Sequence, residues 1–382
     1  MSHPAKRNWA NLPLDLLREI ANRLTIRDCR RFRKVCASWA SVEFPFMPYL
    51  LLPSDDGQYH TLLSAADHTT FPAPPLPALH GKWCVGSQDN WLATLDKYQV
   101  SLLNVFTGEE IKLPSIFTHP RLDMVAFCGI LQFYMTGKLR RLLPQIVFSP
   151  NPSPVDYTAV VLLDYPPVQF MYTRAGEDKW TNLEELKKAQ EVIYRDGRFL
   201  AVLESGETVA VDLDVDGRPS ELIAGRSADF SSSIKYLVDS PGDLLQVRRY
   251  FGQTPVGDGD MMMEIKTARI QVFRWNAGRD EWVPVESLGD QSLFVGTCCS
   301  FSFEDQEIPG LKGNRVYFTD DCSAFLCSDK GREATWDVGV FSLEDGSIET
   351  CLPPIPSPKP NCRRPPIWII LPNSLLDVSV DG

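Results

Sequence analysis

The chain has 382 residues, of which 44% are hydrophobic and 23% charged, and these values are ordinary for a folded globular protein. Its net charge of −11 is unevenly spread, because residues 1–40 carry nine Lys or Arg against three Asp or Glu. This contrast predicts two modules with different partners, and it argues against nucleic-acid binding by the acidic remainder.

Cysteine spacing and hydropathy argue against three further classes of protein: metal-binding, secreted and membrane proteins. None of the ten Cys forms a Cys-x-x-Cys pair, and no His is close in sequence to the adjacent Cys298 and Cys299 or to Cys322 and Cys327, so we predict no metal site and no cofactor. The N-terminal residues lack the apolar stretch of a signal peptide, and no apolar run reaches the about 20 residues that cross a bilayer. We therefore expect no membrane partner and an intracellular location, in nucleus or cytoplasm, with free thiols.

Residues 12–24 predict an amphipathic helix, with Asn11 as a possible cap and Pro13 in the first turn. About 35 residues are too few to bury a broad apolar face alone, so part of it should meet another surface of this chain or of a partner. The apolar residues at helical spacing are Leu12, Leu16, Leu17, Ile20, Ala21 and Leu24.

A second helix is predicted from Thr25, because Thr25-Ile-Arg-Asp28 matches a capping pattern. We interpret its basic face as solvated or as complementary to an acidic partner, with RNA or acidic lipid as alternatives. The basic face holds Arg30, Arg31, Arg33 and Lys34, and the apolar face holds Cys29, Phe32, Val35, Cys36 and Trp39.

These segments together resemble an F-box. The pattern Leu-Pro-x-Asp-Leu-Leu-x-Glu-Ile begins at Leu12, and Arg33-Lys-Val-Cys-Ala-Ser-Trp39 completes it, with Cys29 as a soft departure. The resemblance implies an F-box domain over residues 9–44 that binds a Skp-type adaptor, and through it a cullin and a RING subunit. An amphipathic cap on the next domain is the alternative. The implied adaptor-binding residues are Leu12, Pro13, Leu16, Leu17, Ile20, Leu24, Val35 and Trp39.

Residues 46–382 alternate between strand-like stretches and polar glycine turns, which is typical of β-hairpins. Trp91–Asp96 before a second strand, and Gly197–Leu203 before Thr208–Leu213, are examples. Repeated hairpins with inserted loops predict a β-propeller. Six turns indicate about six blades, at Asp67, Gly108, Gly176, Gly206, Gly278 and Gly346.

The sequence also predicts the local structure of three further segments. Ile367–Leu371 is expected to pair with an early blade and close the ring, which removes a free sheet edge. Thr181–Ala189 looks helical, and Gly252–Glu264 reads as a loop insertion that is a candidate substrate contact.

The large module is similar to the KIB-type propeller of plant F-box proteins. The resemblance lies in the segments that begin at His80 and Leu103, in Asn314–Asp321 and in the Val340–Gly346 turn. It implies a substrate-receptor role and a mainly β fold with small N-terminal helices, and it supplies no catalytic residues.

A calcium-binding loop and a hydrolase are the chemical alternatives to an adaptor, and fewer sequence features support them. Asp212–Gly217 begins like a calcium-binding EF-hand loop, but Ile223 stands where a Glu is required, so a polar turn is favoured. A propeller hydrolase would need converging ionisable groups at one channel mouth, whereas an adaptor would show an exposed apolar or charged rim.

We therefore predict a non-catalytic substrate-recognition subunit of a Skp-cullin-F-box ubiquitin ligase, with an unknown protein substrate. The alternatives are a binding protein that no longer engages a ligase, and a propeller hydrolase.

Overall fold

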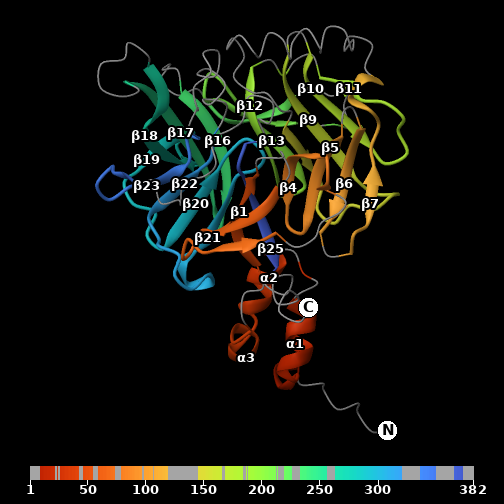
Figure 1. The fold of residues 1–382 in the computed structure, drawn as a ribbon, viewed down its shortest axis with the longest axis vertical. Helices are drawn as coiled ribbons and strands as arrows, with labels where there is room; N and C mark the ends of the chain where they lie inside the picture. The colour runs from red at the N-terminus through yellow and green to blue at the C-terminus, as the bar shows by residue number, and fades with distance from the viewer. Residues whose placement is uncertain are drawn as a thin grey trace.

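The computed structural model describes residues 9–21, 24, 26–42, 46–54, 59–73, 79–96, 99–105, 107–118, 145–165, 168–183, 186, 188–211, 213, 219–225, 233–255, 263–320, 336–349 and 365–372. Short helices come first, and the rest of the described chain is built of strands (Figure 1). The helical elements are η1 (Trp9–Asn11), α1 (Leu14–Ala21), α2 (Ile26–Arg33) and α3 (Ala37–Ala40), with η3 (Ile116–Thr118) and η4 (Asp305–Glu307) between strands.

The described strands form six sheets around a common axis, which confirms the predicted propeller and its blade count (Figure 1). The first two blades are β25 (Ile367–Pro372), β1 (Phe46–Pro53), β2 (Tyr59–Ser64) and β3 (Thr70–Pro72), then β4 (Trp83–Gln88), β5 (Trp91–Asp96), β6 (Gln99–Asn104) and β7 (Glu110–Lys112). The third and fourth are β8 (Gln145–Phe148), β9 (Thr158–Tyr165), β10 (Val168–Arg174) and β11 (Thr181–Asn182), then β12 (Ala189–Arg195), β13 (Arg198–Leu203), β14 (Thr208–Val211) and β15 (Pro219–Ala224). The fifth is β16 (Ser233–Ser240), β17 (Asp243–Pro255), β18 (Met263–Asn276) and β19 (Glu281–Val285), and the sixth is β20 (Gln291–Val295), β21 (Phe301–Glu304), β22 (Arg315–Phe318), β23 (Gly339–Ser342) and β24 (Ile348–Glu349).

The ring is closed by β25, as predicted. This strand pairs antiparallel with β1, from Phe46 opposite Pro372 to Leu51 opposite Ile367. The last described strand thus completes the first blade, and the inner edge of β1 is covered rather than left as a free edge.

The sixth blade departs from a simple meander. Its β21 pairs antiparallel with β20 on the inner side, while β22 pairs parallel with β20 on the outer side. The chain crosses between these strands through η4, whose capping box joins Glu304 and Glu307.

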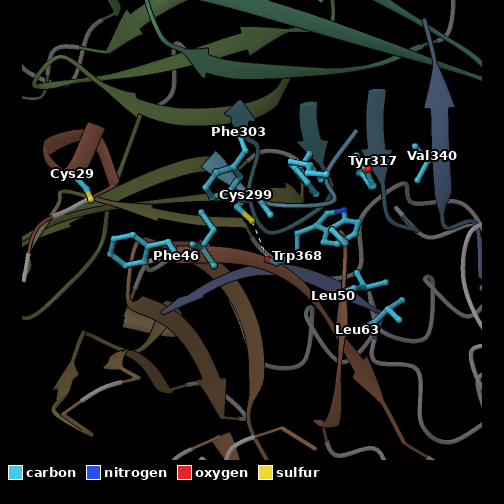
Figure 2. Packing of buried hydrophobic residues seen from close by; sticks show 14 of the residues in the cluster. Cys29, Phe46, Leu50, Leu63, Cys299, Phe303, Tyr317, Val340 and Trp368 are labelled. Carbon is cyan, nitrogen blue, oxygen red and sulfur yellow. Dashed lines mark hydrogen bonds between the residues drawn. The ribbon is translucent and has the colours of Figure 1, made fainter. Parts of the chain in front are cut away.

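One hydrophobic cluster runs from the helices into the propeller. Leu17, Cys29 and Phe32 of the helices belong to the same cluster as Phe46 of β1 and Trp368 of β25. Figure 2 shows part of this cluster, including the Cys299 thiol, which donates to the Trp368 carbonyl at 3.1 Å. The helices are therefore attached to the propeller by packing as well as by the connecting chain.

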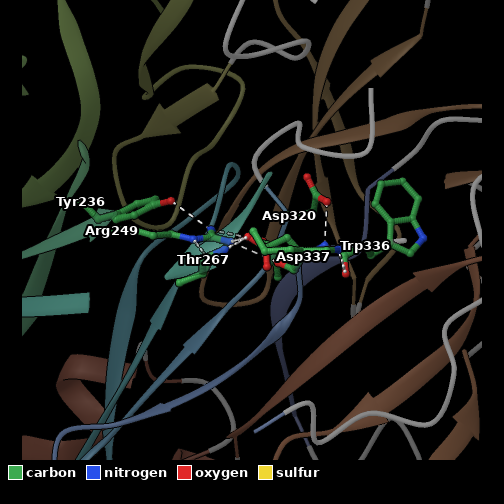
Figure 3. A network of polar contacts seen from close by, with 8 residues as sticks. Tyr236, Arg249, Thr267, Asp320, Trp336 and Asp337 are labelled. Carbon is green, nitrogen blue, oxygen red and sulfur yellow. Dashed lines mark hydrogen bonds and ion pairs between the residues drawn. The ribbon is translucent and has the colours of Figure 1, made fainter. Parts of the chain in front are cut away.

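A buried polar network joins the fifth and sixth blades (Figure 3). The Arg249 guanidinium on β17 lies 2.8 Å from the Asp337 carboxylate, which precedes β23. That carboxylate also accepts hydrogen bonds from the Thr267 amide and hydroxyl, and the Asp320 carboxylate accepts one from the Asp337 amide. Burial lowers the pKa of Arg249, and the charges of Asp337 and Asp320 oppose that shift.

Two predictions about local structure were wrong in detail. Thr181–Ala189 is not helical in its described residues: β11 ends at Asn182 and β12 begins at Ala189. The Gly252–Glu264 segment is partly strand, because β17 continues to Pro255 and β18 begins at Met263, with residues 256–262 outside the described chain. The predicted turn at Gly206 is present and joins the second and third strands of its blade, whereas the other five predicted turns join the two outermost strands of theirs.

Candidate protein-interaction sites

Helix α1 has two apolar sides with different surroundings. Leu17 and Ala21 are fully buried in the cluster shared with the propeller. Leu16 and Ile20 lie on another side of the helix and keep 52% and 38% of their surface exposed. One side of α1 thus packs in the shared core, and the other remains exposed.

The structure places the predicted adaptor-binding residues in three environments. Pro13, Leu16, Ile20 and Val35 are exposed, while Leu12, Leu24 and Trp39 are half-buried and pack against the shared cluster. Leu17 differs from the prediction because it is only 1% exposed, so its side chain stabilises the chain's own core instead of offering contact surface.

The second predicted helix is broken. Helix α2 ends at Arg33 and α3 begins at Ala37, with a tight turn in which the Val35 amide donates to the Phe32 carbonyl. The break turns Val35 away from the buried face that contains Cys29 and Phe32, and it leaves Val35 60% exposed. A continuous helical register was therefore the wrong basis for grouping these residues.

Sequence reasoning overlooked Trp9 and Leu14, which are 58% and 41% exposed. The backbone at Trp9 is held in place, since the Trp39 indole N–H donates to its carbonyl at 3.1 Å. The Ser38 hydroxyl adds a bond of 2.7 Å to the carbonyl of Ala10. An apolar aromatic residue immediately before the motif was the available signal. We call Trp9, Leu14, Leu16, Ile20 and Val35 the exposed apolar set.

A cavity of about 680 Å³ lies at one mouth of the propeller channel. The innermost strands β4, β8, β12, β16, β21 and β25 border it or carry the adjoining turns, and α2 forms another wall. Helix α2 contributes Asp28 and Arg31, and Lys34 directly follows the helix, so the helical module and the propeller share this cavity.

Ionisable groups do converge at this mouth, as the hydrolase alternative requires. The carboxylates of Asp28, Asp196 and Asp239 are each engaged by a guanidinium: Arg31 lies 3.2 Å from Asp28, and Arg195 lies 3.3 Å and 3.2 Å from the other two. This arrangement is a charged rim of paired groups.

Side chains also link the inner segments of different blades. The Gln145 side chain on β8 accepts from the Val192 amide, and the buried Glu191 carboxylate on β12 accepts from the Leu237 amide and the Ser300 hydroxyl. Glu191 is fully buried. These bonds tie strands of different blades together where no β-ladder joins them, so the channel wall is a fixed surface.

The metal-site and calcium-loop alternatives can be compared with the described residues. Within the described ranges, no three His, Cys, Asp or Glu side chains come together as metal ligands. Most of the Asp212–Gly217 segment lies outside those ranges, and it connects β14 to β15, which pair antiparallel.

In the described residues, no helix has the length and apolar character of a membrane span.

Comparison with known proteins identifies both modules. A family model described as the KIB1-4 beta-propeller matches residues 62–342, and one described as the F-box domain matches residues 9–42. The chain belongs to the KIB1-4 β-propeller family and carries an F-box.

Related proteins occur in the plant Arabidopsis thaliana. The F-box protein SKIP23 is 28% identical over 397 residues, covering 95% of both chains. F-box protein At2g17036 is 26% identical with 95% of both chains covered, and probable F-box protein At4g22165 is 23% identical with 89% of this chain and 91% of that protein covered. The predicted resemblance to plant F-box proteins with a KIB-type propeller is confirmed.

The matched ranges agree with the observed modules. The F-box range contains α1, α2, α3 and the whole exposed apolar set. The KIB1-4 propeller range begins inside β2 and ends at the last residue of β23, so the ring-closing pair of β1 and β25 lies outside it.

Proposed function

We propose that this protein is the substrate-recognition subunit of a Skp-cullin-F-box ubiquitin ligase. The F-box would bind a Skp-type adaptor, which links it to a cullin and a RING subunit, and the propeller would bind the protein to be modified. The chain itself would make no bonds, because its contribution is to hold the substrate near the ubiquitin-charged enzyme.

The exposed apolar set is the observation that supports adaptor binding. Leu16 and Ile20 remain exposed although Leu17 and Ala21 of the same helix are buried against the chain's own core. Burying an aliphatic side chain of this size contributes about 1.5–3 kcal/mol. Several such residues on an F-box give a surface sufficient for a stable complex.

A pull-down of the full-length protein with a purified plant Skp-type adaptor tests the proposal. We expect the wild type to bind, and Leu16→Asp together with Ile20→Asp to weaken binding by about 100-fold or more, because both carboxylates would be buried unpaired. The double variant should fold normally, since neither position belongs to the buried core.

The matched control is Val155→Asp with Leu222→Asp, which changes two exposed apolar residues of the propeller. This control should bind the adaptor like the wild type. Full binding by the Leu16/Ile20 variant would refute the assigned interface. No binding by folded wild type would favour a receptor that holds its partner without engaging a ligase.

A further inference from the structure

A segment of the sixth blade closes the propeller channel next to the mouth cavity. Residues 296–300 connect β20 to β21, and Cys299 and Ser300 among them line the cavity. The Cys299 thiol donates to the Trp368 carbonyl on the innermost strand of the first blade (Figure 2). The Ser300 hydroxyl donates to the Glu191 carboxylate on the innermost strand of the fourth blade, which is opposite the first in a ring of six. The segment therefore crosses the channel, and the cavity has a floor instead of continuing through the ring.

Two serine hydroxyls of the cavity lining have no hydrogen-bond partner among the described residues. Ser240 is the last residue of β16 and is 2% exposed, and Ser87 is half-buried on β4. The Oγ atoms of both are enclosed and unpaired. Buried polar groups are nearly always paired with protein or with another bound molecule. Because no partner fixes their rotamers, rotation about χ1 can direct either hydroxyl toward a molecule in the cavity.

The charged groups of the cavity are balanced and partly fixed. Among the described residues, three basic and four acidic side chains line it, so neither sign predominates. Arg195 lies 3.3 Å from Asp196 and 3.2 Å from Asp239, and both carboxylates keep part of their surface exposed. A carboxylate has about four lone-pair positions and a guanidinium has several N–H donors, so this pairing leaves further hydrogen-bonding positions on each group. Donors and acceptors therefore lie side by side in the lining.

Phe301 adds an aromatic surface to the cavity. It is the first residue of β21, it is half-buried and it belongs to the lining. The Phe294 ring stacks on it with centroids 4.9 Å apart and an interplanar angle of 15°, and Phe294 also stacks on Tyr317 at 4.6 Å. This stack fixes the Phe301 ring, and the part of the side chain that remains accessible is a small apolar surface.

We propose that the cavity binds a small neutral ring compound with several hydroxyl groups, that is, a cyclic polyol or a mono- or disaccharide. A hydroxyl both donates and accepts hydrogen bonds, which matches the adjoining guanidinium and carboxylate groups and the two serines. The C–H face of the ring would pack on Phe301. The four carboxylates disfavour an anion, and the closed floor disfavours a chain that would pass through the ring.

The size of the cavity agrees with a ligand of this class. Its volume of about 680 Å³ lies within the range of small-molecule pockets, about 300–1,000 Å³. Because α2 forms one wall, the ligand would contact both modules. The inference goes beyond the proposed ligase role and does not depend on it.

The test measures binding directly, because sugars also stabilise proteins by exclusion from their surface and a higher melting temperature would not demonstrate a site. Saturation-transfer NMR on the full-length protein compares glucose, sucrose, trehalose and myo-inositol with mannitol, an open-chain polyol, and with glucose 6-phosphate. We expect at least one of the four ring compounds to bind with a dissociation constant of about 1 mM or below, and mannitol to bind about tenfold more weakly than that compound. No saturable binding by the four ring compounds would overturn the proposal. Tighter binding of mannitol or of glucose 6-phosphate than of every neutral ring compound would also overturn it.

Two cavity variants locate the site. Ser87→Ala with Ser240→Ala should weaken binding about tenfold, because two hydrogen bonds to the ligand would be lost. The free variant should unfold in urea like the wild type, since neither hydroxyl has a partner to lose among the described residues. Phe301→Leu retains an apolar side chain without the ring and should weaken binding by a similar factor.

The matched control is Thr173→Val on β10, which removes a fully buried hydroxyl that also has no described partner but lies outside the cavity lining. This control should bind the ligand like the wild type. Unchanged binding by either cavity variant would place the ligand elsewhere and refute the inference. The adaptor pull-down is independent of these measurements, so either proposal can fail without the other.

Discussion

The buried ion pair between Arg249 and Asp337 gives a quantitative stability prediction (Figure 3). Arg249 is fully buried, and its guanidinium donates to the Thr267 hydroxyl at 2.7 Å, the Thr319 carbonyl at 2.6 Å and the Asp337 carboxylate at 2.8 Å. Arg249→Met keeps a long apolar side chain but removes the cation. Asp337, which is 6% exposed, would then keep its charge with only the donors of Thr267.

Removing one partner of a buried ion pair lowers the free energy of unfolding by about 3–5 kcal/mol, because the remaining charge stays buried without compensation. That is a large fraction of the about 5–15 kcal/mol by which a domain is stable. We therefore expect Arg249→Met to lower the free energy of unfolding in urea by about 3–5 kcal/mol. Arg274→Met is the matched control, since its pair with Asp243 is 3.0 Å long but half-exposed and should contribute less than about 1 kcal/mol.

A double variant identifies the cause of that loss. Arg249→Met with Asp337→Asn removes both charges and retains an amide oxygen that can accept from Thr267. We expect it to unfold at a higher urea concentration than Arg249→Met alone, with a coupling free energy of about 2 kcal/mol or more. Additive losses, or a cost below about 1 kcal/mol for Arg249→Met, would refute the claim that uncompensated burial of the carboxylate is responsible.

Three other predictions concern the blades. Gly86→Ala should lower the free energy of unfolding by at least about 2 kcal/mol, because its Cβ would lie 2.0 Å from a backbone oxygen of β8, whereas Gly225→Ala meets no atom within 4 Å and should be nearly neutral. A chain that ends at residue 364 lacks β25 and should aggregate in light scattering, whereas one that ends at residue 372 retains the closing strand and should stay monomeric. Hydrogen bonds from Ser347 lower the pKa of Asp345 to about 2, so this carboxylate stabilises the fold above pH 3.8 and its contribution is lost as the pH falls toward 2. The melting temperatures of wild type and Asp345→Asn should therefore converge over that range, and a constant difference would contradict the assignment.

Local sequence patterns predicted the individual hairpins well. Trp91–Asp96 was predicted as a strand and is β5 with the same ends, and the closing strand at Ile367–Leu371 was also predicted. Both segments are short apolar runs bordered by turn residues, so their own sequences determine their structure. The order of strands within a blade can be predicted from local sequence in the same way wherever tight turns join consecutive strands.

The wrong predictions arose where local pattern and tertiary packing disagree. Thr181–Ala189 has Leu183 and Leu186 at helical spacing, yet both are buried in the propeller core beside strands. Glycine and proline suggested a loop after Gly252, but the paired register continues to Pro255 opposite Met263. Short apolar segments of this kind do not distinguish helix, strand and loop by periodicity alone.

Long-range contacts could not be read from the sequence at all. Arg249 and Asp337 are 88 residues apart, and no local pattern marks them as partners. The same holds for the cavity, because residues as distant in sequence as Lys34, Asp89 and Asp196 line it only in the folded chain. Motif resemblance predicted that the F-box helices are present, but the extent of their exposure depends on the propeller.

The shared core explains why the F-box has a free apolar side. Helix α1 has eight residues and cannot bury all of its apolar residues between three short helices. Leu17 and Ala21 are covered because they join a cluster that includes Phe46 of the propeller, and this packing limits rotation of α1. Once that side is fixed, Leu16 and Ile20 must point away from the core. The propeller therefore sets both the orientation and the exposure of the surface that we propose for the adaptor.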